Sequence, residues 1–91
     1  MSGVVLSVDL SSAYREGWGM ESVRKQFAVN LRHHRERVGL SQEALADICD
    51  LHRTEISLLE RCKRSPRLET IVILARGLEL PSTGELLEGI R

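Results

Sequence analysis

Residues 42–60 constrain the fold of this chain more than any other segment, because they hold two short helical patterns separated by a brief interruption. The first pattern forms one apolar helix face, made of Leu45, Ala46 and Cys49. Residues 50–52 then break the periodicity. The second pattern forms another inner face, made of Ile56, Leu59 and Glu60. We therefore predict two short helices, over about residues 42–49 and 53–61, joined by a tight turn.

The second of these predicted helices also has a side that the core does not use. At about 100° per residue, its outward arc holds mostly hydrogen-bonding side chains, namely Arg53, Thr54, Ser57, Leu58 and Arg61. The major groove of DNA accepts one α-helix and presents base-edge acceptors and thymine methyl groups. A short helix with this outward face suits that groove, so the segment is a candidate DNA-reading element.

A wider set of residues matches one known family: Arg35, Gly39-Leu40-Ser41-Gln42, Leu45-Ala46, Leu51, Thr54, Ile56-Ser57, Glu60, Lys63, Pro66 and the run from Leu68 to Leu80. Over about residues 23–90 the chain resembles the phage-repressor/Cro-type helix-turn-helix family, also called the xenobiotic-response-element family. This resemblance implies an all-α, five-helix DNA-binding domain. The sequence of residues 52–57 is most similar to small stand-alone regulators of the family, including restriction-modification controller proteins.

Two positions depart from the family pattern, since most members have glycine where Asp50 and Cys62 stand. Aspartate tolerates the left-handed backbone conformation better than most residues, so we expect the turn after residue 49 to form. Cysteine is poor at positive φ. We therefore expect the loop after the second helix of the motif to be strained or reshaped.

Length and composition limit the class of protein. A chain of 91 residues allows one domain with a modest core. No stretch approaches the roughly 20 apolar residues that a membrane-spanning helix needs, so we expect no membrane partner. Two cysteines without a secretory signal indicate reduced thiols, and we predict a cytoplasmic location.

The net charge of zero is an average over unlike segments. Residues 1–22 hold one basic and three acidic side chains, and residues 68–91 hold two basic and four acidic ones. Residues 23–67 hold ten basic and six acidic side chains, a net charge of +4. The positive charge thus coincides with the candidate DNA-reading element, although small domains often vary this much by chance.

Residues 1–22 are predicted to be an N-terminal extension or arm, and residues 23–91 the helix-turn-helix DNA-binding domain. Within the arm, Val4, Leu6, Val8 and Leu10 alternate with other residues at the period of a strand. A single strand is not stable alone, and the rest of the chain predicts only helices. Two interpretations remain: a mobile tail, or a strand that pairs with the same segment of a second subunit.

Three further helices complete the prediction, over about residues 23–38, 68–77 and 83–88. The first has Phe27, Leu31 and Val38 on its inner stripe, and the last opens on Ser82-x-x-Glu85, a capping-box pattern. Arg35 shares the stripe of the first helix, and Glu60 lies on the inner side of another helix. Because an unpaired buried charge is costly, we predict an Arg35–Glu60 ion pair; the alternative is two exposed charges.

The predicted DNA contacts fall into two groups. The base-contacting residues are Arg53, Thr54, Ser57 and Leu58, and the phosphate-contacting residues are Gln42, Arg61, Lys63 and Arg64. Gln42 opens a helix whose N-terminus attracts phosphate, and the other three belong to a basic loop. The alternative for each is an ordinary solvated side chain. Glu55, at the flank, can accept from cytosine N4 or pair with a nearby arginine.

No other chemistry is evident in the sequence. The His, Cys, Asp and Glu residues show no metal-site spacing and no nucleophile–base–acid set, so we predict no metal, no cofactor, no small-molecule ligand and no enzyme. The favoured function is a sequence-specific DNA-binding transcriptional regulator that acts as a homodimer on an inverted repeat. Its predicted dimer interface is Leu86, Leu87 and Ile90. The alternative is a protein-interaction module, antitoxin-like or an adaptor, built on the same fold.

Overall fold

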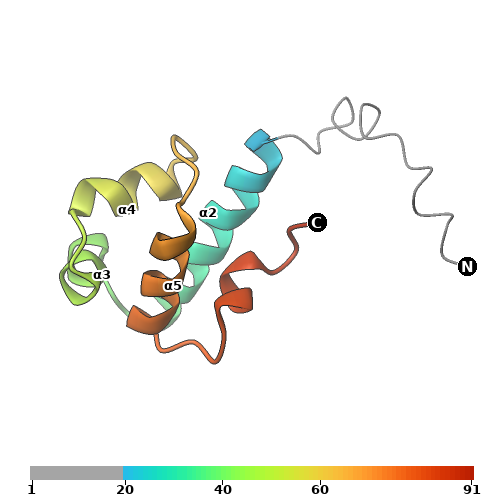
Figure 1. Cartoon of the computed structure of the whole chain (residues 1–91). Helices are drawn as coiled ribbons and strands as arrows, with labels where there is room; N and C mark the ends of the chain where they lie inside the picture. The colour runs from blue at the N-terminus through green and yellow to red at the C-terminus, as the bar shows by residue number, and fades with distance from the viewer. Residues whose placement is uncertain (1–19) are drawn as a thin grey trace, which may run out of the picture.

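The computed structural model describes residues 20–91, which fold as four α-helices and one 3-10 helix. They are α2 (Met20–Arg37), α3 (Gln42–Cys49), α4 (Arg53–Glu60), α5 (Leu68–Gly77) and η3 (Thr83–Leu87). In Figure 1, α3 and α4 lie at one side of the molecule, α5 crosses in front of α2, and η3 leads the chain back toward α2. The all-α prediction is confirmed for this part of the chain. The predicted strand falls in residues 1–11, outside the described residues.

The predicted fifth α-helix is a 3-10 helix instead, Thr83–Leu87. Ser82 precedes it, but its side chain makes no capping hydrogen bond, so the predicted capping box does not form. The N–H of Glu85 donates to the carbonyl of Ser82 at 3.2 Å, which is the three-residue spacing of a 3-10 turn. Glycines at 84 and 89 disfavour a longer helix here, because glycine is a poor helix former.

One core joins all five elements. Its buried apolar residues are Phe27, Leu31, Leu45, Ala46, Cys49, Ile56, Leu59, Ile71, Leu74, Ala75, Leu78 and Leu86. The prediction that Val38 belongs to this core is wrong, since Val38 is 48% exposed. The helix ends at Arg37 and Gly39 turns the chain with φ +76°, so Val38 lies beyond the inner stripe. The predicted boundary between residues 22 and 23 also falls inside α2 rather than before it.

Three helix ends close on non-glycine residues in the left-handed conformation, Asp50, Cys62 and Glu79, at φ 56°, 61° and 56°. Cys62 thus adopts a positive φ, although this conformation is unfavourable for cysteine. The N–H of the next residue, Lys63, donates to the carbonyl of Leu58 at 2.9 Å and closes α4. This conformation costs a residue with a Cβ roughly 1–2 kcal/mol. The expected strain at Cys62 is therefore present, and the turn forms in spite of it.

Two contacts hold α5 and η3 against the rest of the fold. Asn30 of α2 donates from Nδ2 to the carbonyls of Leu86 and Glu88, at 2.9 and 2.8 Å. Gly77 lets α5 approach α3 closely, because a Cβ at this position would lie 2.5 Å from Cys49 Sγ. Burial raises the pKa of the Cys49 thiol, so this cysteine is a neutral core residue.

Candidate nucleic-acid interface

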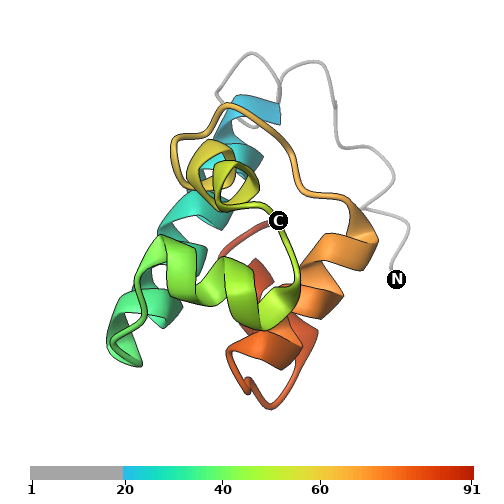
Figure 2. The same ribbon diagram turned by 90° about the vertical axis from the view of Figure 1, so that its left-hand side faces the viewer.

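The helix-turn-helix is built from local signals at the ends of α3. Ser41 precedes this helix, and its Oγ accepts a hydrogen bond from the N–H of Ala44 at 3.0 Å. At the other end, Asp50 adopts the left-handed conformation and its N–H reaches the carbonyls of Ala46 and Asp47. The chain then turns into α4 at Arg53. Figure 2 looks nearly along α4 and shows α3 running across the molecule below it.

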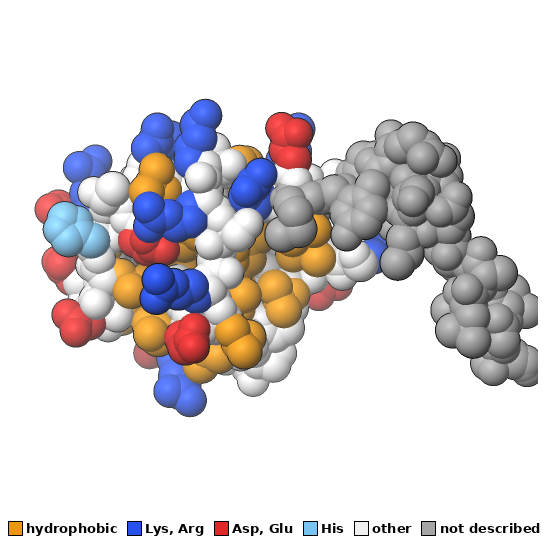
Figure 3. Space-filling view, turned by 45° about the horizontal axis from the view of Figure 1, so that its top comes forward, with side chains coloured by type: hydrophobic (Ala, Val, Ile, Leu, Met, Phe, Trp, Pro, Cys, Tyr) orange, Lys and Arg blue, Asp and Glu red, His pale blue; other side chains and the backbone are white. Residues whose placement is uncertain are grey.

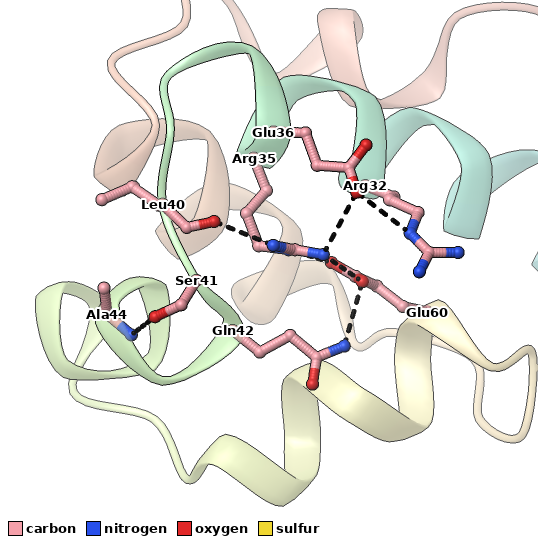
Figure 4. Close-up of polar contacts among 8 residues, drawn as sticks. All are labelled: Arg32, Arg35, Glu36, Leu40, Ser41, Gln42, Ala44 and Glu60. Atoms are coloured by element: carbon pink, nitrogen blue, oxygen red, sulfur yellow. Dashed lines mark hydrogen bonds and ion pairs between the residues drawn. The ribbon is translucent and has the colours of Figure 1, made fainter.

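A buried ion pair holds α4 in place. Arg35 of α2 donates from Nε and Nη2 to the two carboxylate oxygens of Glu60, at 2.7 and 2.9 Å (Figure 4). The two side chains are only 9% and 2% exposed. Arg35 also donates from Nη1 to the carbonyl of Leu40 at 2.8 Å. The hydrogen bonds with Glu60 raise the pKa of Arg35, so the guanidinium stays charged, and its two N–H groups grip the carboxylate in a bidentate pair.

Gln42 joins the same network rather than pointing into solvent. Its Nε2 donates to Glu60 at 3.1 Å, which links the start of α3 to the end of α4 (Figure 4). The sequence predicts that the Gln42 side chain contacts a DNA phosphate, whereas in the structure its amide nitrogen donates to the Glu60 carboxylate. Sequence reasoning missed this role because the partner lies eighteen residues away along the chain. The N-terminus of α3 keeps the outward N–H groups and partial positive charge of any helix start.

The predicted base-contacting residues differ in exposure. Arg53 and Thr54 are exposed at the start of α4, whereas Ser57 and Leu58 are half-buried. Ser57 Oγ accepts a hydrogen bond from Arg61 Nε at 3.2 Å. Among residues 20–91, the side chain of Arg53 makes no hydrogen bond and no ion pair. The first turn of α4 therefore presents the most available donors of this helix.

The loop after α4 carries the remaining predicted phosphate contacts. Lys63 is exposed, while Arg64 pairs with Glu55 of α4 through its Nη1. Of the two roles considered for Glu55, the structure therefore shows the pairing with a nearby arginine. Basic side chains gather over α4 and this loop in the space-filling view of Figure 3. The surface thus combines a donor-bearing helix with a basic border.

The predicted dimer residues do not all lie on the surface. Leu86 is fully buried in the core, so it is not available to a second subunit. The sequence places it outward because its helix was expected to be α-helical; the 3-10 geometry points it between α2 and α5, the two helices on which η3 packs. Leu87 is 37% exposed and Ile90 is half-buried. Sequence reasoning missed Asn30, the buried amide that holds this segment.

Two absences apply to residues 20–91 only. No helix in this range is long and apolar enough to cross a membrane. No group of three His, Cys, Asp or Glu side chains in the same range is placed to hold a metal ion.

Comparison with known proteins agrees with this geometry. The family described as a helix-turn-helix domain matches residues 26–88 of the chain. The chain belongs to this helix-turn-helix family. The match includes α3, α4, α5 and η3, together with most of α2. The resemblance seen in the sequence to the xenobiotic-response-element type of helix-turn-helix regulator is thereby confirmed.

Individual relatives of this helix-turn-helix protein carry regulatory names. It is 45% identical over 56 residues to the control protein C.SmaI of Serratia marcescens, a match that covers 62% of this chain and 67% of the relative. Its fold resembles a hypothetical transcription factor from Neisseria, with a TM-score of 0.69 and 35% identity, over 76% of this chain and 78% of that chain.

A third similar protein is the restriction-modification controller protein C.AhdI of Aeromonas hydrophila. Its TM-score is 0.67 and its identity is 36%, over 69% of this chain and 94% of that chain. The names of these three proteins are those of a control protein, a transcription factor and a restriction-modification controller. Together with the family match, these relatives support a helix-turn-helix transcription regulator.

Proposed function

We propose that this protein is a sequence-specific DNA-binding regulator that acts as a homodimer on an inverted-repeat operator. The observation that carries the proposal is the exposed Arg53, which has no partner among residues 20–91, on a helix that a buried ion pair holds in place. A rigid helix with free donors can match the pattern of base-edge acceptors in a major groove. The names of the two controller relatives support a regulatory role of the same kind.

Within this proposal the DNA contacts form two groups, those with bases and those with phosphates. Arg53, Thr54, Ser57 and Leu58 face the bases. The phosphates are held by the loop residues Arg61, Lys63 and Arg64 and by the α3 N-terminus at Gln42. Residues 23–91 form the DNA-binding domain, and residues 1–22 are an arm that includes the start of α2. One helix reads too few base pairs for specificity in a genome, so a two-fold dimer with half-site centres about 34 Å apart is needed.

The proposed dimer surface lies around Leu87 and Ile90, without Leu86. Ile90 also lines an open groove of about 510 Å³ together with Val23 and Val29. Val29 is 57% exposed, which leaves apolar area uncovered in the monomer. A second subunit that covers this area would stabilise the dimer by removing apolar surface from water.

Selection of bound DNA from a random pool, followed by sequencing, tests the whole proposal. We expect the enriched sequences to share an inverted repeat. A failure to bind any DNA at low salt would instead favour the protein-interaction module, because nonspecific binding needs only a basic surface.

Replacing Arg53 with alanine should weaken operator binding by about 1–3 kcal/mol and relax the preference at one base pair of each half-site. The reason is that a guanidinium grips guanine O6 and N7 with two hydrogen bonds, which alanine cannot replace. Electrophoretic mobility shifts on the operator and on its single-base variants measure both effects. Unchanged affinity together with unchanged preference would remove Arg53 from the base-contacting set.

Replacing Lys63 with alanine should weaken operator and random DNA equally. If Lys63 neutralises one phosphate, the slope of log affinity against log salt becomes shallower by about 0.9. Fluorescence anisotropy over a salt series measures the slope for both DNAs. A loss confined to one operator sequence would assign Lys63 to the bases instead.

Replacing Leu87 with glutamate should weaken the homodimer, because a charge would be buried in the apolar contact. Analytical ultracentrifugation over a concentration series measures the dissociation constant, and circular dichroism checks that the fold is kept. Val38, an exposed valine just past the end of α2, gives a control as Val38→Glu. Dimerisation that is equally tight in both variants would place the interface elsewhere.

A further inference from the structure

The ion pair between Glu55 and Arg64 joins α4 to the loop that follows it. The Glu55 side chain is 21% exposed and the Arg64 side chain is 52% exposed, so the pair sits at the surface. Arg64 is one of the three cations predicted to lie along the DNA backbone, and Glu55 lies on the helix proposed to enter the groove. The pair therefore connects the two parts of the candidate interface.

The negative charge of Glu55 is unusual on a helix that is proposed to approach DNA. The sequence of α4 holds two carboxylates, Glu55 and Glu60. Glu60 is 2% exposed and is neutralised by Arg35. Glu55 is thus the carboxylate of this helix that would approach DNA phosphates, where a negative charge is unfavourable.

We propose that Glu55 is a specificity-determining residue, which restrains Arg64 and so weakens binding to random DNA more than binding to the operator. This inference rests on the proposed function. It concerns the ratio of the two affinities, which decides whether a regulator finds its site among many competing sequences. Glu55 acts through Arg64 and touches no base in this role.

The physical argument follows from how random DNA is bound. Binding without sequence preference depends on the number of phosphates that the protein neutralises, and each contributes about 0.9 to the salt slope. When Arg64 is paired with Glu55, it adds no net charge to the surface. To neutralise a phosphate it must either leave Glu55 or carry that carboxylate toward the DNA.

Operator DNA can compensate for this cost and random DNA cannot. Hydrogen bonds from α4 to the correct bases add free energy only at the operator. The restraint on Arg64 is therefore overcome there, whereas on random DNA it removes roughly one phosphate contact.

The neighbouring cations show that the restraint is specific to Arg64. Arg61 is also held, but by the neutral hydroxyl of Ser57 at 3.2 Å, so its charge is not cancelled. Lys63 is exposed and has no carboxylate partner among residues 20–91. Arg64 is accordingly the cation of this loop that is paired with an acid.

The test compares Glu55→Gln with the full-length wild type on the selected operator and on random duplex DNA. We expect the salt slope on random DNA to steepen by about 0.9, an affinity loss about 3.5-fold larger between 50 and 200 mM salt. The operator affinity should rise less, so the ratio of the two affinities falls. Glutamine has the shape of glutamate, and circular dichroism checks that the fold is kept.

Two controls separate this mechanism from a simple change in net charge. Glu79→Gln makes the same charge change at an exposed position in the turn after α5, outside the proposed DNA-contacting and dimer residues, and should leave the slope unchanged. Repeating Glu55→Gln in an Arg64→Gln background should also leave the slope unchanged, because the restrained cation is gone.

The outcomes are distinct. An unchanged slope in Glu55→Gln, an equal change in both backgrounds, or weaker binding to random DNA would each overturn the proposed role of Glu55. If the wild-type protein binds neither DNA, the proposed function itself fails, and that result is visible before any variant is compared.

Discussion

Glu60→Ala is expected to lower the free energy of unfolding by about 3–5 kcal/mol. The substitution leaves the Arg35 guanidinium nearly buried without its carboxylate, and Gln42 loses its acceptor as well. An uncompensated buried charge is more costly than the loss of the attraction alone. Arg35 keeps only its hydrogen bond to the Leu40 carbonyl and a distant contact with Glu36.

Thermal and urea unfolding measure this effect, and Glu36→Ala is the matched control. Glu36 lies on α2, and its side chain is 60% exposed, so its ion pair with Arg32 should contribute less than about 1 kcal/mol. The double variant Arg35→Met, Glu60→Leu should recover much of the lost stability, because it removes both charges together. A melting shift of only a degree or two in Glu60→Ala would show that the pair is solvated.

The second large effect is expected at Leu86. Leu86→Ala should destabilise the monomer by about 2–5 kcal/mol, because a fully buried side chain would leave a cavity between η3 and the helices it packs on. This expectation replaces the dimer role that the sequence suggested for this residue.

Its neighbour Leu87 provides the control, since the two leucines differ in exposure and not in chemistry. Leu87→Ala should change stability by much less when unfolding is measured at a protein concentration that keeps the chain monomeric. If the two substitutions cost the same, the 3-10 segment does not hold Leu86 in the core.

The α3–α4 unit was predictable because its signals are local. The bounds of α3 and α5 follow from a serine cap, apolar periodicity and a proline break, all within a few residues of each helix. The Arg35–Glu60 pairing was also predictable, since each charge stands on an apolar stripe. The two residues are twenty-five positions apart in the sequence, and the packing of the folded chain brings their side chains together.

Other features depend on long-range packing and were missed or misplaced. Gln42 turns toward a carboxylate that only the folded chain brings near it. Leu86 enters the core because five residues form a 3-10 turn, a choice that helix periodicity alone does not reveal. Val38 follows the apolar stripe in sequence but lies past the end of its helix.

Two side chains of α2 anchor two different parts of the domain. Arg35 fixes α4, and Asn30 fixes η3; the positions are five residues apart and so point to different sides of one helix. Accordingly α4 packs on α2 and α3, whereas η3 packs on α2 and α5. Outward substitutions on α4, the helix proposed to read DNA, therefore leave the segment proposed to join two subunits undisturbed. Under the proposed function, such a domain acquires new operators while it keeps one mode of assembly.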